Sequence, residues 1–110
     1  MSAEVIVIGD DVRIERTLMI GDDAYDASGA TSIKVAFVST DHSTKLTADI
    51  EQDENASGAD WANGVVIIEM AAADTADITD DGPAILELQV DKTIKQTWHM
   101  AVLLVEGQIE

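Results

Sequence analysis

The chain has 110 residues, of which 46% are apolar, so we expect one domain with one hydrophobic core, spanning residues 1–110. The 22 acidic residues outnumber the 6 basic ones and give a net charge of −16, which disfavours nucleic acid and anionic membranes as partners. The lack of cysteine excludes disulfides and cysteine-ligated zinc. The N-terminus has no basic segment followed by a long apolar run, so we predict no signal peptide.

Short runs of alternating apolar and polar residues predict β-strands along the whole chain. Residues 4–8 form the first strand, and residues 12–20 form the clearest one. One face of that second strand consists of Val12, Ile14, Arg16, Leu18 and Ile20. Turns containing Asp and Gly follow both strands. Further strands are predicted at residues 31–40, 45–51, 61–70, 84–90 and 94–106.

The last third of the chain predicts one helical turn and one hairpin. Residues 71–77 break the alternation and are expected to form a single helical turn capped by Asp74 or Thr75. Residues 91–93 are the expected tip of the hairpin that joins the last two strands. About seven strands with turn signals every 8–12 residues predict an all-β fold, an antiparallel sandwich, with a barrel as the alternative.

No motif in the sequence predicts catalysis or cofactor binding. There is no nucleophile elbow and no glycine-rich phosphate loop. His42 falls in a predicted turn and His99 in the last strand, and we name no catalytic, cofactor-binding or metal-binding residue and expect no cofactor. An enzyme would need a site around one of these two histidines, and we expect that replacing both by Ala leaves function intact.

Clustered acidic residues leave open a calcium- or carbohydrate-binding β-module as an alternative, with Trp61 in a loop as a sugar contact. The spacing matches no EF-hand, and Asp-Asp and Asp-Gly pairs are the usual components of turns, so we interpret the clusters as turns. The clusters are Asp10 and Asp11, then Asp22, Asp23 and Asp26, then Asp49, Glu51 and Asp53, and finally Asp80 and Asp81.

The aromatic and apolar pattern of the last strand indicates an interface. Trp98 alternates with other core candidates, whereas Trp61 lies beside a polar loop and is the better candidate for an interface anchor. The two faces of the last strand are both largely apolar, which is typical of a strand that lies between two layers or is covered by a neighbouring subunit, and we interpret it as a sign of oligomerisation or docking. The first face is Trp98, Met100, Val102 and Leu104, and the second is His99, Ala101, Leu103 and Val105.

The order of the motifs resembles the N-terminal immunoglobulin-like domain of tailed-phage baseplate upper proteins and related small virion domains. The resemblance covers nearly the whole chain, although Pro83 and Ala84 stand where the family carries an aromatic residue. It rests on Gly-Asp before the second strand at residues 9–14, the Gly/Asp turn at 21–31, the strand at 32–39, the strand at 82–90 and the closing residues 107–110.

The resemblance implies an immunoglobulin-like sandwich that acts as a non-enzymatic structural subunit of a virion, assembled in the host cytoplasm. The expected partners are other virion proteins in the tail, baseplate or head–tail region. We also expect a homo-oligomer or a multi-copy assembly. Capsid decoration is an alternative role, and the family implies no catalytic residues.

Overall fold

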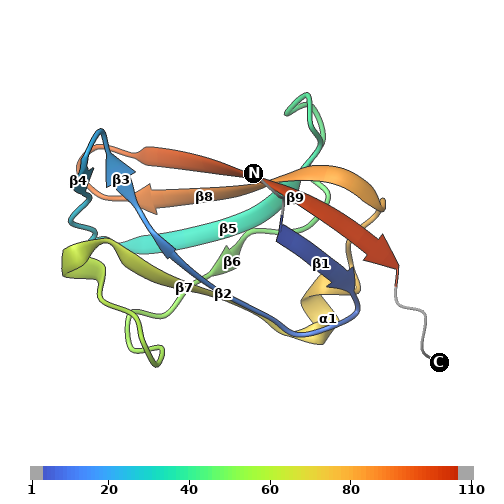
Figure 1. Cartoon of the computed structure of the whole chain (residues 1–110), viewed down its shortest axis with the longest axis horizontal. Helices are drawn as coiled ribbons and strands as arrows, with labels where there is room; N and C mark the ends of the chain where they lie inside the picture. The colour runs from blue at the N-terminus through green and yellow to red at the C-terminus, as the bar shows by residue number, and fades with distance from the viewer. Residues whose placement is uncertain (1–3, 107–110) are drawn as a thin grey trace.

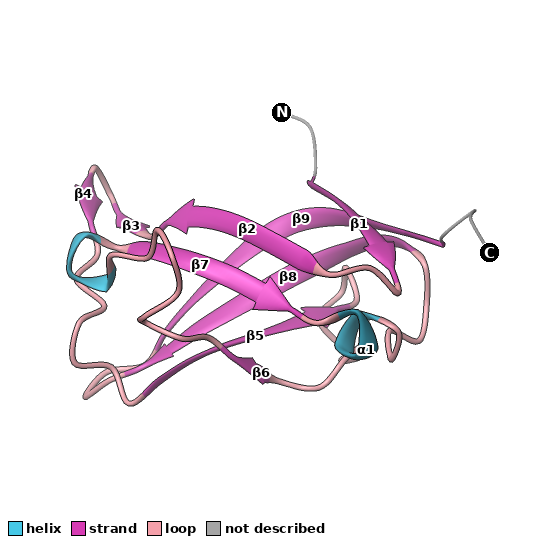
Figure 2. Cartoon of the chain, turned by 90° about the horizontal axis from the view of Figure 1, so that it is seen from below, coloured by secondary structure: helices cyan, strands magenta, loops and turns pink. Residues whose placement is uncertain are grey.

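Two β-sheets pack face to face in the computed structural model, which describes residues 4–106 (Figures 1 and 2). The predicted all-β fold is confirmed. The elements are β1 (Glu4–Ile8), β2 (Val12–Thr17), β3 (Met19–Ile20), β4 (Asp23–Ala24), β5 (Ser32–Val38), β6 (Ile50–Glu51), the 3-10 turn η1 (Trp61–Asn63), β7 (Val65–Met70), α1 (Ala72–Thr75), β8 (Gly82–Asp91) and β9 (Gln96–Glu106). In this part of the chain, no helix is long and apolar enough to span a membrane.

The larger sheet has the strand order β1-β9-β8-β5-β6, and β2 pairs with β7 in the second sheet. All of these pairs are antiparallel except β1 and β9, which run parallel. The larger sheet is therefore mixed at its β1 edge, where the sequence predicted antiparallel strands only. β3 and β4 form a separate two-residue ladder at one end of the molecule (Figure 1). The closing motif at residues 107–110 lies outside the described residues.

The core lies between the two sheets. Figure 2 shows the two sheets from below as separate layers. Alternate residues of β8 point inward, and Leu86, Leu88 and Val90 are completely buried. The continuous apolar run in β7 is buried as predicted, because the loop before η1 covers its other side, where Gly58 lies beside Ile67. Burial of alternate positions on facing sheets is the packing that holds a sandwich together.

The predicted strand at residues 12–20 is divided at Leu18 into β2 and β3, which pair with different strands. β2 stops at Thr17, and Leu18 leaves the ladder with its N–H bonded to the carbonyl of Gly64 and its own carbonyl bonded to the N–H of Tyr25. Ile20, expected on the buried face, is 50% exposed. The alternation therefore holds through the buried Leu18 and fails at Ile20, where the chain has exchanged β7 for β4 as its partner.

Two other predicted strands are shorter than expected. Of residues 45–51, only β6 pairs as a strand, and Lys45 makes an isolated bridge with Val38. Residues 61–63 form η1 instead of a strand, because Gly64 adopts a left-handed conformation with a φ of 80° that closes the turn. Including the three two-residue pieces, the described part of the chain has nine strands, compared with the seven predicted.

The predicted helical turn is present, but its predicted cap is wrong. Ala71 occupies the N-cap position, and the carboxylate of Asp11 accepts a hydrogen bond from the N–H of Ala72 at 2.7 Å. Thr75 is fully buried; its hydroxyl donates to the carbonyl of Asp10 and accepts from the N–H of Gly9. These contacts tie α1 to the turn between β1 and β2.

Candidate functional site

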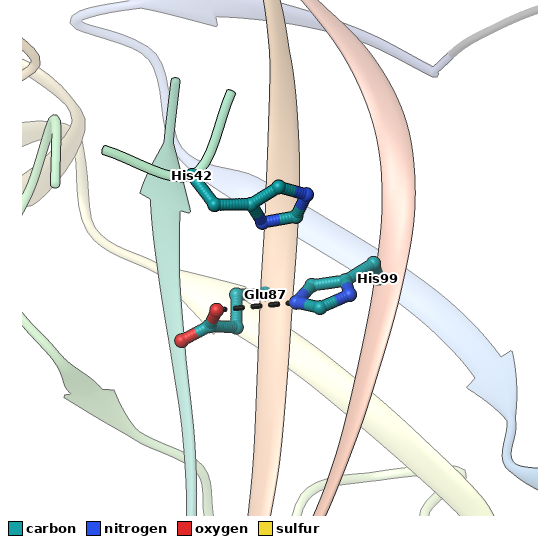
Figure 3. Close-up of side chains that lie close together, drawn as sticks. All are labelled: His42, Glu87 and His99. Carbon is teal, nitrogen blue, oxygen red and sulfur yellow. Dashed lines mark hydrogen bonds and ion pairs between the residues drawn. The ribbon is translucent and has the colours of Figure 1, made fainter. Parts of the chain in front are cut away.

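Three side chains that can bind a metal ion meet on the outer face of the larger sheet (Figure 3). Glu87 and His99 are directly opposite in the antiparallel ladder of β8 and β9. The neighbours of Glu87 in the chain, Leu86 and Leu88, point into the core, so Glu87 points outward. His42 comes from the loop between β5 and β6, which brings its ring over the same position.

The three groups are in contact or nearly so. The Nε2 atom of His99 is 3.2 Å from a carboxylate oxygen of Glu87. The imidazole rings of His42 and His99 lie edge to face, with 4.7 Å between their centroids. One possible ligand atom from each residue lies within 4.8 Å of the others. The side chains of Glu87 and His99 are 32% and 43% exposed, so solvent reaches the cluster.

A compact turn positions His42. The carboxylate of Asp41 accepts hydrogen bonds from the hydroxyls of Ser39 and Ser43, each at 2.6 Å, and from the N–H of Ser43 at 3.0 Å. These bonds hold the pKa of Asp41 well below its usual range. His42 itself has a φ of 61°, a left-handed conformation that disfavours residues with a Cβ atom. The turn therefore sets the direction of the His42 side chain.

The sequence predicts His42 in a turn and His99 in the last strand but gives no sign that the two lie together. Glu87 carried no signal of its own, because it belongs to a regular alternating strand. The one sequence feature that could have indicated the pair is the register of the β8–β9 hairpin, which decides whether Glu87 lies opposite His99. The contact with His42 depends on the path of the loop from Ser39 to Thr44, whose ends meet through the N–H of Thr44 and the hydroxyl of Ser39.

The acidic clusters that left calcium open are dispersed in the structure. Within residues 4–106, His42, Glu87 and His99 are the one group of three or more side chains close enough to share an ion. Several of the acidic side chains instead close turns or pair locally: Asp11 with α1, Asp26 with Ser28, Asp49 with Lys45, and Asp53 with the N–H of Asn55. These contacts agree with the interpretation of the clusters as turns.

Trp61 is not the interface anchor that the sequence suggested. Its side chain belongs to the core, and the residue is only 8% exposed. Its buried indole Nε1 has no hydrogen-bond partner among residues 4–106. The carbonyl of Trp61 accepts hydrogen bonds from the N–H groups of Ala27 and Gly64, which fix the backbone of η1.

An apolar strip occupies the outer face beside the three-residue cluster. Val5 on β1 lies opposite Leu103 on β9, and the two residues are 57% and 37% exposed. Alternate positions on the same strands continue the strip with Ala101, Val105 and Val7, which are exposed or half-buried. β1 is an edge strand of the larger sheet, so the strip ends at a sheet edge. Within residues 4–106, the expected apolar second face of β9 is therefore at least partly exposed.

A second group of exposed apolar side chains lies at the opposite end of the sandwich. Met19 and Ile20 on β3 and Ile94 in the β8–β9 loop are 41%, 50% and 69% exposed. The indole N–H of Trp98 bonds to the carbonyl of Met19, and Tyr25 packs edge-on against the Trp98 ring. Trp98 is thus half-buried at this end and fixes β3 to β9.

No known protein family matches the chain, and no curated protein is significantly similar to it.

Proposed function

We propose that the chain is a non-enzymatic structural subunit of a tailed-phage virion that assembles through contacts with other virion proteins. The observation that carries this proposal is the apolar strip of Val5, Val7, Ala101, Leu103 and Val105 on an edge of the larger sheet. Apolar side chains gathered on one face are typical of a protein–protein contact, because covering them removes apolar surface from water.

The strand order supports the immunoglobulin-like assignment that the resemblance implies. In chain order, β2, β5, β7, β8 and β9 take the places of strands B, C, E, F and G. Strands C, F and G share one sheet in such domains and B and E share the other, which is the distribution seen here. The strand D position is taken by the loop after β6.

Edge strand β1 offers a second means of assembly. A terminal strand can pair with a strand from a neighbour, which extends the sheet across the interface. Its side chains alternate between the core, where Ile6 is 3% exposed, and the apolar strip, where Val5 is exposed. A neighbour that paired with β1 would also cover Val5, so both contacts act in one interface.

The experiment compares incorporation of two lysine variants into virions produced from the genome that encodes the chain. Leu103→Lys places a charge in the apolar strip, whereas Thr97→Lys places the same charge on the same strand face outside it. We expect mass spectrometry of purified particles to detect the wild-type chain and Thr97→Lys in many copies and to detect little Leu103→Lys. Absence of the wild-type chain from particles would overturn the proposal, and equal incorporation of both variants would overturn the role of the strip.

Thermal melting of both purified variants provides the folding control. Both substitutions lie at exposed positions, so we expect melting temperatures close to that of the wild type. A loss of incorporation by a folded Leu103→Lys variant then reports on contact with the neighbour.

A further inference from the structure

We propose that His42, Glu87 and His99 form a binding site for one divalent transition-metal ion of the Zn²⁺ class. The site uses residues of this chain alone and does not depend on the proposed role in a virion. Three segments of the chain supply the ligands: the β5–β6 loop, the middle of β8 and the first half of β9 (Figure 3).

The donor set selects the kind of ion. Imidazole nitrogens bind Zn²⁺, Cu²⁺ and Ni²⁺ well, whereas Ca²⁺ and Mg²⁺ prefer a shell made of oxygen ligands. Two imidazoles and one carboxylate are also a ligand set of zinc sites that keep their fourth position open for water. The partial exposure of His99 and Glu87 leaves room for that water.

The geometry of the cluster is close to that of a filled site. Zinc bonds of about 2.0–2.1 Å in a tetrahedron put neighbouring ligand atoms about 3.3 Å apart. The Nε2 atom of His99 and the carboxylate oxygen of Glu87 already lie 3.2 Å apart. The widest pair of ligand atoms is within 4.8 Å, so small side-chain rotations of the exposed His42 can bring its nitrogen into range.

Two further features favour a cation at this position. The turn around Asp41 holds the backbone of His42 beside β9, so the rotation of the His42 side chain is the main freedom of this residue that is lost when the ion binds. The net charge of −16 attracts cations to the whole surface. Two positively charged side chains, Lys34 and Lys45, line a groove with Glu87. The ion pair between Lys45 and Asp49, at 2.6 Å, offsets the positive charge of Lys45.

The test is calorimetric titration of the purified chain with Zn²⁺, together with the visible absorption of bound Co²⁺. We expect one ion per chain and a Co²⁺ spectrum typical of tetrahedral coordination. Ca²⁺ in excess is expected to leave both signals unchanged. Absence of a one-to-one heat with Zn²⁺, or equal displacement by Ca²⁺, would overturn the site.

Three variants test the ligands separately. His42→Gly removes one imidazole and suits the left-handed backbone, so the variant is expected to fold at least as stably as the wild type. His42→Gly, His99→Ala and Glu87→Gln should each weaken Zn²⁺ binding by at least about tenfold. Asp22→Asn, which removes one charge from an exposed turn, is the matched control and should bind as the wild type does. Wild-type affinity in His42→Gly, or an equal loss in Asp22→Asn, would contradict the assignment.

Discussion

The two faces of the larger sheet have different physical roles. The inner face packs against β2 and β7 and is apolar and closed, with Leu86 and Leu88 completely buried. The outer face of the same strands carries Glu87 and His99 beside the exposed apolar strip around Leu103. Burial of alternate residues therefore specifies the fold, whereas the residues between them are available for binding.

Leu104 and Leu103 compare the two faces directly, because they are neighbours on β9. Leu104 is 1% exposed in the core, and Leu103 belongs to the strip. We expect Leu104→Ala to lower the free energy of unfolding by about 2–5 kcal/mol because it leaves a cavity, and Leu103→Ala to lower it by less than about 1 kcal/mol. Chemical denaturation of both variants measures the difference, and equal losses would mean that the strip contributes to the core.

Gly64 tests how tightly the interior closes at the end near β3. A Cβ atom there would lie 2.8 Å from the carbonyl oxygens of both Leu18 and Tyr25, at a φ of 80°. We expect Gly64→Ala to destabilise the fold by about 3 kcal/mol, since backbone must move to relieve the contacts. Gly29→Ala is the control, because it has a similar φ but open space around it. A smaller loss for Gly64→Ala than for Gly29→Ala would show that the close approach is not real.

The acidic surface should respond to salt more than the core does. The charge of −16 destabilises the compact state by self-repulsion, which salt screens. We therefore expect the melting temperature to rise by a few degrees between low salt and about 0.5 M NaCl, where the Debye length is only a few ångströms. A melting temperature that does not change with salt would contradict the charge argument.

Asp26 gives the smallest expected effect and a pH dependence. Hydrogen bonds from the Ser28 hydroxyl and N–H, with a smaller effect of Lys92, lower the pKa of Asp26. A lowered folded-state pKa stabilises the fold above the unfolded value of about 3.9, and this stabilisation is lost as the pH falls through the folded value. Asp26→Asn should therefore be slightly less stable than the wild type at pH 7, and the difference should shrink in acid. A difference in melting temperature that is constant from pH 7 to pH 3 would contradict this assignment.

Alternation in the sequence was sufficient to predict the all-β fold and much of the core. The inward positions of β8 and the buried run in β7 were both predictable, because each depends on a single strand and its periodicity. The break at Leu18 was not predictable, because the chain changes its pairing partner there. The N–H of Leu18 bonds to Gly64 beside β7, and its carbonyl accepts from Tyr25 beside β4. Trp61 was misplaced for a similar reason, since the turn that buries it closes at Gly64.

The metal-binding cluster depends on details that sequence patterns do not fix. A hairpin tip at residues 91–93 would place Glu87 opposite Thr97, whereas the observed loop at residues 92–95 places it opposite His99. His42 reaches the pair through the turn around Asp41, which no periodic pattern predicts. The register of one hairpin and the path of one loop therefore decide whether the site exists.

A high-resolution cryo-electron microscopy map of virions that contain the chain would test directly whether the outer face of the larger sheet is an assembly surface. We predict that a neighbouring subunit covers Val5 and Leu103 in the assembled particle, while Leu104 stays in the interior of the sandwich. A map in which Val5 and Leu103 face solvent in every copy would contradict the claim that this outer face is the assembly surface.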